Sequence, residues 1–133
     1  MAWNDLTAII TIMRDDNTKF FSSYTDEQLT ALKRGSALQV LESDVLSENK
    51  ISNGSDEILN EFAANYSDRL NLALTYKQLE SFYFENNNAE GSLTASRFET
   101  YKAKYNEAKR YFQDFELATV TDYITTIRTF KIG

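Results

Sequence analysis

The feature that most constrains the fold is a stripe of aromatic side chains near the C-terminal end of the chain. The stretch RFETYKAKYNEAKRYFQDFE, residues 97–116, repeats large or apolar residues at helical spacing: Phe98, Tyr101, Tyr105, Ala108, Phe112 and Phe115. Each buried Phe or Tyr ring removes about 150–250 Å² from water, so this face must pack against another surface. Three interpretations stay open: a seam in the chain's own core, a partial contact with another subunit, or a platform that stacks a ligand or a base, which the lack of basic charge around it disfavours.

The composition removes most kinds of catalytic and metal chemistry. The 133 residues include no Cys, no His and no Pro. Zinc and non-haem iron therefore lose their usual ligands, and the common Ser–His and Cys–His nucleophile pairs cannot form. The neighbouring carboxylates of Asp15 and Asp16, in a predicted loop, are candidates for a hard cation, although acidic loop residues are usually just solvated. We expect a protein that is not an enzyme and uses no metal or cofactor.

The charge and the hydropathy pattern narrow the partners. A net charge of −6 and a pI near 4.7 argue against a surface that holds nucleic acid by its phosphates or docks on anionic lipid. No apolar run approaches the roughly 20 residues of a membrane span. The beginning of the chain lacks the basic leader of a signal peptide, so we expect a cytoplasmic protein with no membrane partner.

Helical patterns cover most of the chain. The first runs from Asn4 to about Met13, and the second from Thr25, in a capping box with Gln28, to about Leu46. Gly35 falls inside the second and suggests close approach of a neighbouring backbone. The third runs from residue 55 to about residue 84, with a split allowed at NYSD, residues 65–68. The last opens at residue 92 or 94.

These patterns predict an all-α fold. We expect a small bundle of about four to five helices over residues 1–118, followed by an extended, β-prone C-terminal arm over residues 119–133. The two longest helices carry overlapping apolar seams. The predicted core is therefore centred on Leu70, Leu74, Phe82, Phe98, Tyr105 and Phe112.

The C-terminal arm is the first candidate for binding a partner. The stretch ATVTDYITTIRTFKIG is rich in β-branched and aromatic residues but has no obvious strand to pair with. It is either a terminal hairpin strand or an arm that docks on a partner. The predicted contacts of the arm are Tyr123, Ile124, Ile127, Arg128, Phe130 and Ile132. Trp3 and Tyr111 are candidate interface residues, although a lone Trp near the N-terminus usually closes the edge of a core.

Two long segments resemble a known family. The run DEILNEFAANYSDRLNLALTYKQLESFYFENN, then a polar loop, then TASRFETYKAKYNEAKRYFQDFE, is similar to the two core helices of tailed-bacteriophage head–tail connector proteins, also called adaptor or head-completion proteins. The resemblance covers roughly half the chain. It implies a structural virion protein, made in the bacterial host cytoplasm and placed in the neck of the virion.

The resemblance also implies a set of partners. Subunits would form a ring, typically of about twelve, under the portal protein and against other connector or tail subunits. The ring would line a channel through which DNA passes without specific binding, and the arm would reach into the portal or a neighbouring subunit. The alternative function is a small cytoplasmic regulatory or adaptor protein that binds one protein partner through its aromatic face.

Overall fold

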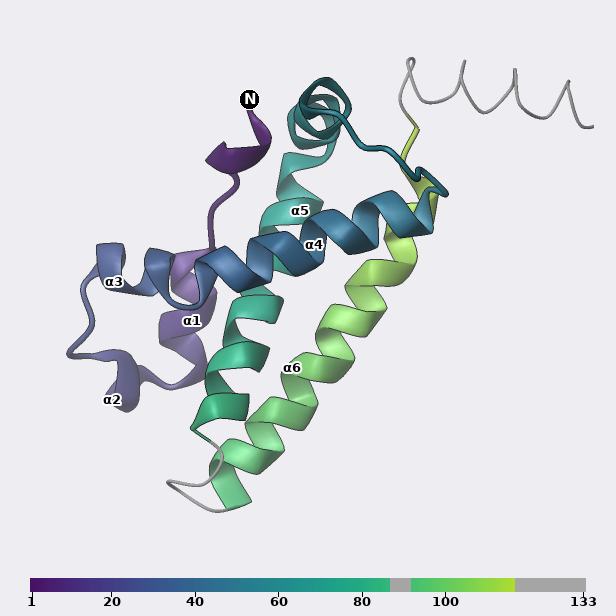
Figure 1. Ribbon diagram of the computed structural model, residues 1–133. Helices are drawn as coiled ribbons and strands as arrows, with labels where there is room; N and C mark the ends of the chain where they lie inside the picture. The colour runs from purple at the N-terminus through teal and green to yellow at the C-terminus, as the bar shows by residue number, and fades with distance from the viewer. Residues whose placement is uncertain (87–91, 117–133) are drawn as a thin grey trace, which may run out of the picture.

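The computed structural model describes residues 1–86 and 92–116, and this part of the chain is all-α, as predicted (Figure 1). It contains six α-helices, two short 3-10 helices and no strand. In chain order the elements are η1 Trp3–Asp5, α1 Ile10–Asp16, α2 Thr18–Phe21, α3 Asp26–Ala31, α4 Arg34–Glu48, α5 Asp56–Glu85, α6 Ser92–Arg110 and η2 Tyr111–Asp114. The predicted arm, residues 119–133, lies outside the described residues.

The predicted helix from Asn4 to Met13 is wrong over its first half, where tertiary hydrogen bonds hold the chain in another conformation, and confirmed from Ile10 onward. The chain forms η1, continues without helix through residues 6–9, and begins α1 only at Ile10. Side chains of α5 accept hydrogen bonds from the backbone of this segment. The pairs are Trp3 N to Asn60 Oδ1 at 2.8 Å, Thr7 N to Asn71 Oδ1 at 2.9 Å and Ile9 N to Thr75 Oγ1 at 2.8 Å.

The second predicted helix is divided into α3 and α4. The capping box of Thr25 and Gln28 is confirmed at the start of α3. The helix then ends because Lys33 takes a left-handed conformation, with φ of 57°, and α4 begins at the next residue. Buried Gln78 of α5 stabilises the break, because its Nε2 group donates hydrogen bonds to the carbonyls of Thr30 (3.1 Å) and Leu32 (2.7 Å). A Cβ on Gly35 would meet nothing within 4 Å, so the expected close approach there is wrong.

The long helix α5 bends where the sequence allowed it to split. Tyr66 has non-helical dihedral angles, φ −130° and ψ 30°, within α5. Its ring stacks on Phe115, with centroids 4.0 Å apart and planes 8° from parallel. Its hydroxyl donates to the carbonyl of Glu116 at 2.9 Å and accepts from the amide of Glu116 at 2.6 Å. The bend thus fixes the end of the described chain against α5.

Helix α5 is the centre of the molecule. Helices α1 to α3 pack along one side of it, α6 runs antiparallel along another, and α4 crosses the α5–α6 pair (Figure 1). Five of the six predicted core residues are buried, and Phe98 is half-buried. Four rings of the aromatic stripe are also buried, which confirms that it is a seam in the chain's own core. These rings are Tyr101, Tyr105, Phe112 and Phe115.

Phe112 provides a direct test of this core. Its side chain is 1% exposed and its ring lies 5.4 Å from that of Phe115. Phe112→Ala should lower the free energy of unfolding by about 3–5 kcal/mol, because it removes buried apolar surface and leaves a cavity. Denaturant unfolding followed by circular dichroism measures the change. Tyr111→Ala, at the half-exposed neighbouring position, is the control, and a loss under about 1 kcal/mol for Phe112→Ala would contradict the assignment.

Candidate functional site

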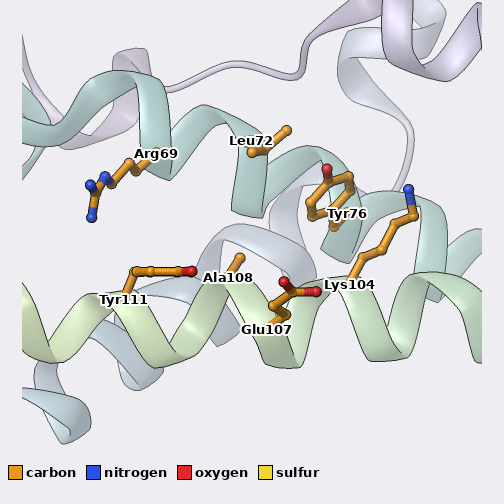
Figure 2. A pocket seen from close by; sticks show the side chains of 7 residues that line it. All are labelled: Arg69, Leu72, Tyr76, Lys104, Glu107, Ala108 and Tyr111. Carbon is orange, nitrogen blue, oxygen red and sulfur yellow. The ribbon is translucent and has the colours of Figure 1, made fainter.

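A groove opens between α5 and α6, with a cavity volume of about 530 Å³ (Figure 2). Helix α5 forms one wall and α6 forms the other, and side chains of both point into the space between them. The volume falls within the range of ligand and peptide pockets. We call this feature the α5–α6 groove, and its lining residues are Arg69, Leu72, Tyr76, Lys104, Glu107, Ala108 and Tyr111.

The groove follows from two stripes on α6. Tyr105 and Phe112 lie on the buried seam, whereas Lys104, Ala108 and Tyr111 form a second stripe, offset around the helix and also spaced by four and three residues. Ala108 carries only a methyl group, so the space beside it between the two helices is left unfilled. The second stripe is therefore available to a partner, and the first is not.

The groove carries two positive charges, on Arg69 and Lys104, and one carboxylate, on Glu107. Within the described part of the chain, neither Arg69 nor Lys104 forms an ion pair. The Arg69 guanidinium lies 5.5 Å from the centre of the Tyr111 ring, and Lys104 Nζ lies 5.6 Å from the centre of the Tyr76 ring. Such cation–π contacts position a cation without cancelling its charge. With Tyr111 51% exposed, the groove suits an acidic surface.

A second polar feature is buried where α1, α5 and α6 meet. Asp16 accepts hydrogen bonds from the hydroxyls of Tyr83 and Tyr101, the latter at 2.5 Å, and its Oδ1 lies 3.0 Å from Arg97 Nη1. Its side chain is only 10% exposed. We call these four residues the Asp16 cluster. Both carboxylate oxygens are occupied by protein donors, so the cluster joins three helices and has no free oxygen to offer a substrate.

The structure does not join Asp15 and Asp16 into one cation site. Both lie in the last turn of α1 and not in a loop, and Asp15 is exposed while Asp16 belongs to the buried cluster. No group of three or more acidic side chains that could hold a metal ion is found among the residues the structure describes. The described acidic pair therefore provides no chelating set.

A similar contact holds α4 to α6. The Tyr105 hydroxyl donates to Asp44 Oδ2 at 2.6 Å, and Lys109 Nζ lies 4.0 Å from Asp44 Oδ1. Burial, and then hydrogen bonding to a carboxylate, raises the pKa of Tyr83, Tyr101 and Tyr105 well above the ordinary tyrosine value of 10.0. The hydroxyls of Tyr101 and Tyr105 act as neutral donors that tie α6 to α1 and α4, and the hydroxyl of Tyr83 ties α5 to α1.

The predicted interface residues differ in where they lie in the structure. Trp3 is 5% exposed and lies in the core beside α5, so it closes a core edge. Tyr111 is exposed and lines the α5–α6 groove. The arm residues from Tyr123 to Ile132 lie outside the described residues. The sequence did not lead us to predict the α5–α6 groove. The pattern that could have indicated it is the stripe of Lys104, Ala108 and Tyr111, which runs beside the aromatic stripe.

Comparisons with known proteins add no relative. No family profile matches the chain, and no curated protein and no solved structure gives a significant match. None of the helices in residues 1–86 and 92–116 has the length and apolar character needed to cross a membrane.

The Asp16 cluster predicts that replacing one carboxylate by an amide of the same shape lowers the stability of the fold. Asp16→Asn keeps the shape of the side chain but removes the negative charge that faces Arg97 and accepts hydrogen bonds from the hydroxyls of Tyr83 and Tyr101. The free energy of unfolding should fall by roughly 2–3 kcal/mol. Asp15→Asn removes an exposed charge on the same helix and should change it by less than about 0.5 kcal/mol. Equal effects of the two variants in urea unfolding would show that the cluster does not hold the helices together.

The buried tyrosines predict a loss of stability at alkaline pH. The unfolded chain ionises its tyrosines near pH 10, whereas the folded chain keeps the protons of Tyr83, Tyr101 and Tyr105. Their contribution to stability is therefore complete below about pH 10 and falls above it, by up to about 1.4 kcal/mol per pH unit for each tyrosine. Urea unfolding at a series of pH values measures the slope. Tyr105→Phe should make the slope shallower, and an unchanged slope would refute the assignment.

Proposed function

We propose that the protein is a subunit of the head–tail connector of a tailed bacteriophage. In this role it forms a ring under the portal, joins head to tail, and lines the channel through which DNA leaves the head. The segments that resemble the two core helices of this family correspond to α5 and the greater part of α6 with η2, and these segments pack as an antiparallel hairpin. This pairing is the observation that carries the proposal.

The position of the chain end supports a docking role for the arm. Phe115 and Glu116 are held against Tyr66 by the stacked ring and two hydrogen bonds. The seventeen residues that follow Glu116 in the sequence therefore start from a fixed point at one end of the hairpin. In the proposed connector, a docked arm would thus be joined to the helical bundle at a fixed point.

The charge of the chain fits a channel for DNA. With a net charge of −6, its surface does not hold phosphates by electrostatic attraction, so a duplex can slide past it. The alternative is a regulatory protein that binds one partner through the aromatic face of α6, and the burial of that face in the chain's own core makes it the weaker proposal. Four rings of that face are buried in the chain's own core: Tyr101, Tyr105, Phe112 and Phe115.

Deletion of residues 119–133 tests the proposed role of the arm. Circular dichroism and thermal unfolding should show an intact helical core, since all the core contacts described above lie within residues 1–116. The truncated chain should fail to bind portal rings in co-sedimentation and fail to enter phage particles on complementation.

Two full-length variants serve as controls. Ile127→Ser with Phe130→Ser keeps the arm's length but removes apolar contacts, so docking should also be lost. Thr125→Ala with Thr126→Ala should dock normally. Normal assembly of the truncated chain would overturn the role of the arm, and a failure of the full-length protein to bind portal or enter particles would overturn the connector function itself.

A further inference from the structure

We propose that the α5–α6 groove docks a second copy of this chain, and that the surface it receives is the acidic segment formed by residues 42–61. This segment comprises the end of α4, the loop after it and the first turns of α5. The inference rests on the proposed ring, and it names the two surfaces through which neighbouring subunits would meet.

The first argument is the unequal distribution of charge along the chain. Residues 42–61 contain six carboxylates and a single basic residue, Lys50, and two of the carboxylates, Asp44 and Glu48, already contact α6 and η2 of the same chain. Helix α6 has five basic and two acidic residues; Arg97 and Lys109 are paired within the chain, and Lys104 is the α6 cation that lines the groove. Asp56 and Glu57 are exposed at the start of α5, where they are available to a neighbour. Complementary surfaces of this kind steer association and fix its register.

The second argument is that the cations of the groove are placed but not neutralised. Arg69 lies over Tyr111 and Lys104 lies over Tyr76, one toward each end of the groove (Figure 2). Glu107 also lines the groove and reduces its positive charge, so a compact acidic surface fits better than a long polyanion. An exposed ring beside a charged rim is the usual composition of a protein interface.

The third argument is that the acidic segment of one copy does not fill the groove of the same copy. Helix α4 contacts α6 through Tyr105, Lys109 and Gln113, on a different face from the stripe of Lys104 and Ala108 that lines the groove. The α4 part of the acidic segment, through Asp44 and Glu48, therefore meets α6 and η2 away from the groove, and no residue of 42–61 lines the groove of its own chain. Contact between two different surfaces of identical copies is head-to-tail, and it closes into a ring when the rotation between neighbours permits.

A charge exchange tests the pairing. Arg69→Glu with Lys104→Glu reverses the groove, and Asp56→Lys with Glu57→Lys reverses the acidic segment. Each double variant should self-associate at least about tenfold more weakly than the wild type in sedimentation velocity at low salt. Mixing the two variants should restore association, because each then offers the surface that the other lacks. Lys19→Glu with Lys102→Glu changes the net charge equally outside the groove and should leave association unchanged.

A cross-link identifies the contact directly. The chain has no cysteine, so single cysteines can be introduced without competing thiols. Copies with Glu57→Cys should form a disulfide with copies carrying Ala108→Cys, and copies with Glu27→Cys should not. Circular dichroism of each variant excludes loss of folding as the cause of a negative result.

The outcomes separate this inference from the connector proposal. Reversed variants that associate like the wild type, or a wild type that stays monomeric at every concentration and salt tested, would overturn the docking of a second copy. Cross-linking of Ala108→Cys to a cysteine at Ile127 of the same chain would assign the groove to the arm instead. In either case binding to portal rings can still be measured, so the connector function stands or falls on that experiment alone.

Discussion

The packing of the aromatic seam of α6 against α5 is the contact on which the other helices depend. Tyr101, Tyr105 and Phe112 bury large apolar surfaces, and the two tyrosines also bring hydroxyls that need acceptors inside the protein. Asp16 of α1 and Asp44 of α4 supply them. The hairpin thus determines by hydrogen bonding where two further helices can lie. Replacing Tyr101 or Tyr105 by an apolar residue would keep the buried surface but remove the hydroxyl that binds the carboxylate of the neighbouring helix.

Polar side chains on α5 have the same role for the N-terminal segment. The amides of Trp3 and Ile9 are partly buried, where an N–H without a partner is costly, so the acceptors on α5 select one path for residues 3–9. The spacing of the acceptors explains why the segment lies along the helix, since residues eleven and four apart share one face. They are Asn60, Asn71 and Thr75. Gln78 acts similarly at the end of α3.

Two parts of the α5–α6 hairpin are not covered by the other described helices, the groove on its side and its end at Glu116, and both proposals on function concern these parts. One side of the α5–α6 pair is covered by α4 and the other forms the groove, so the charges of Arg69 and Lys104 stay available. The end of the hairpin is closed by Tyr66 and Glu116, which sets the point from which the arm departs. In the proposed connector, the groove would receive a neighbouring subunit, and Glu116 would be the fixed point that precedes the predicted arm.

The sequence by itself determined the helical class, the position of α5 and α6, the capping of α3 by Thr25, and most of the core. These features depend on local propensity and on the spacing of apolar residues, which are legible in one dimension. Only the tertiary structure decided the non-helical path of residues 6–9, the break at Lys33, the partners of Asp16 and the groove beside Ala108. Each of these depends on side chains distant in the sequence, because a buried donor or an unfilled space is defined by what lies opposite it, and that is fixed only when the helices pack.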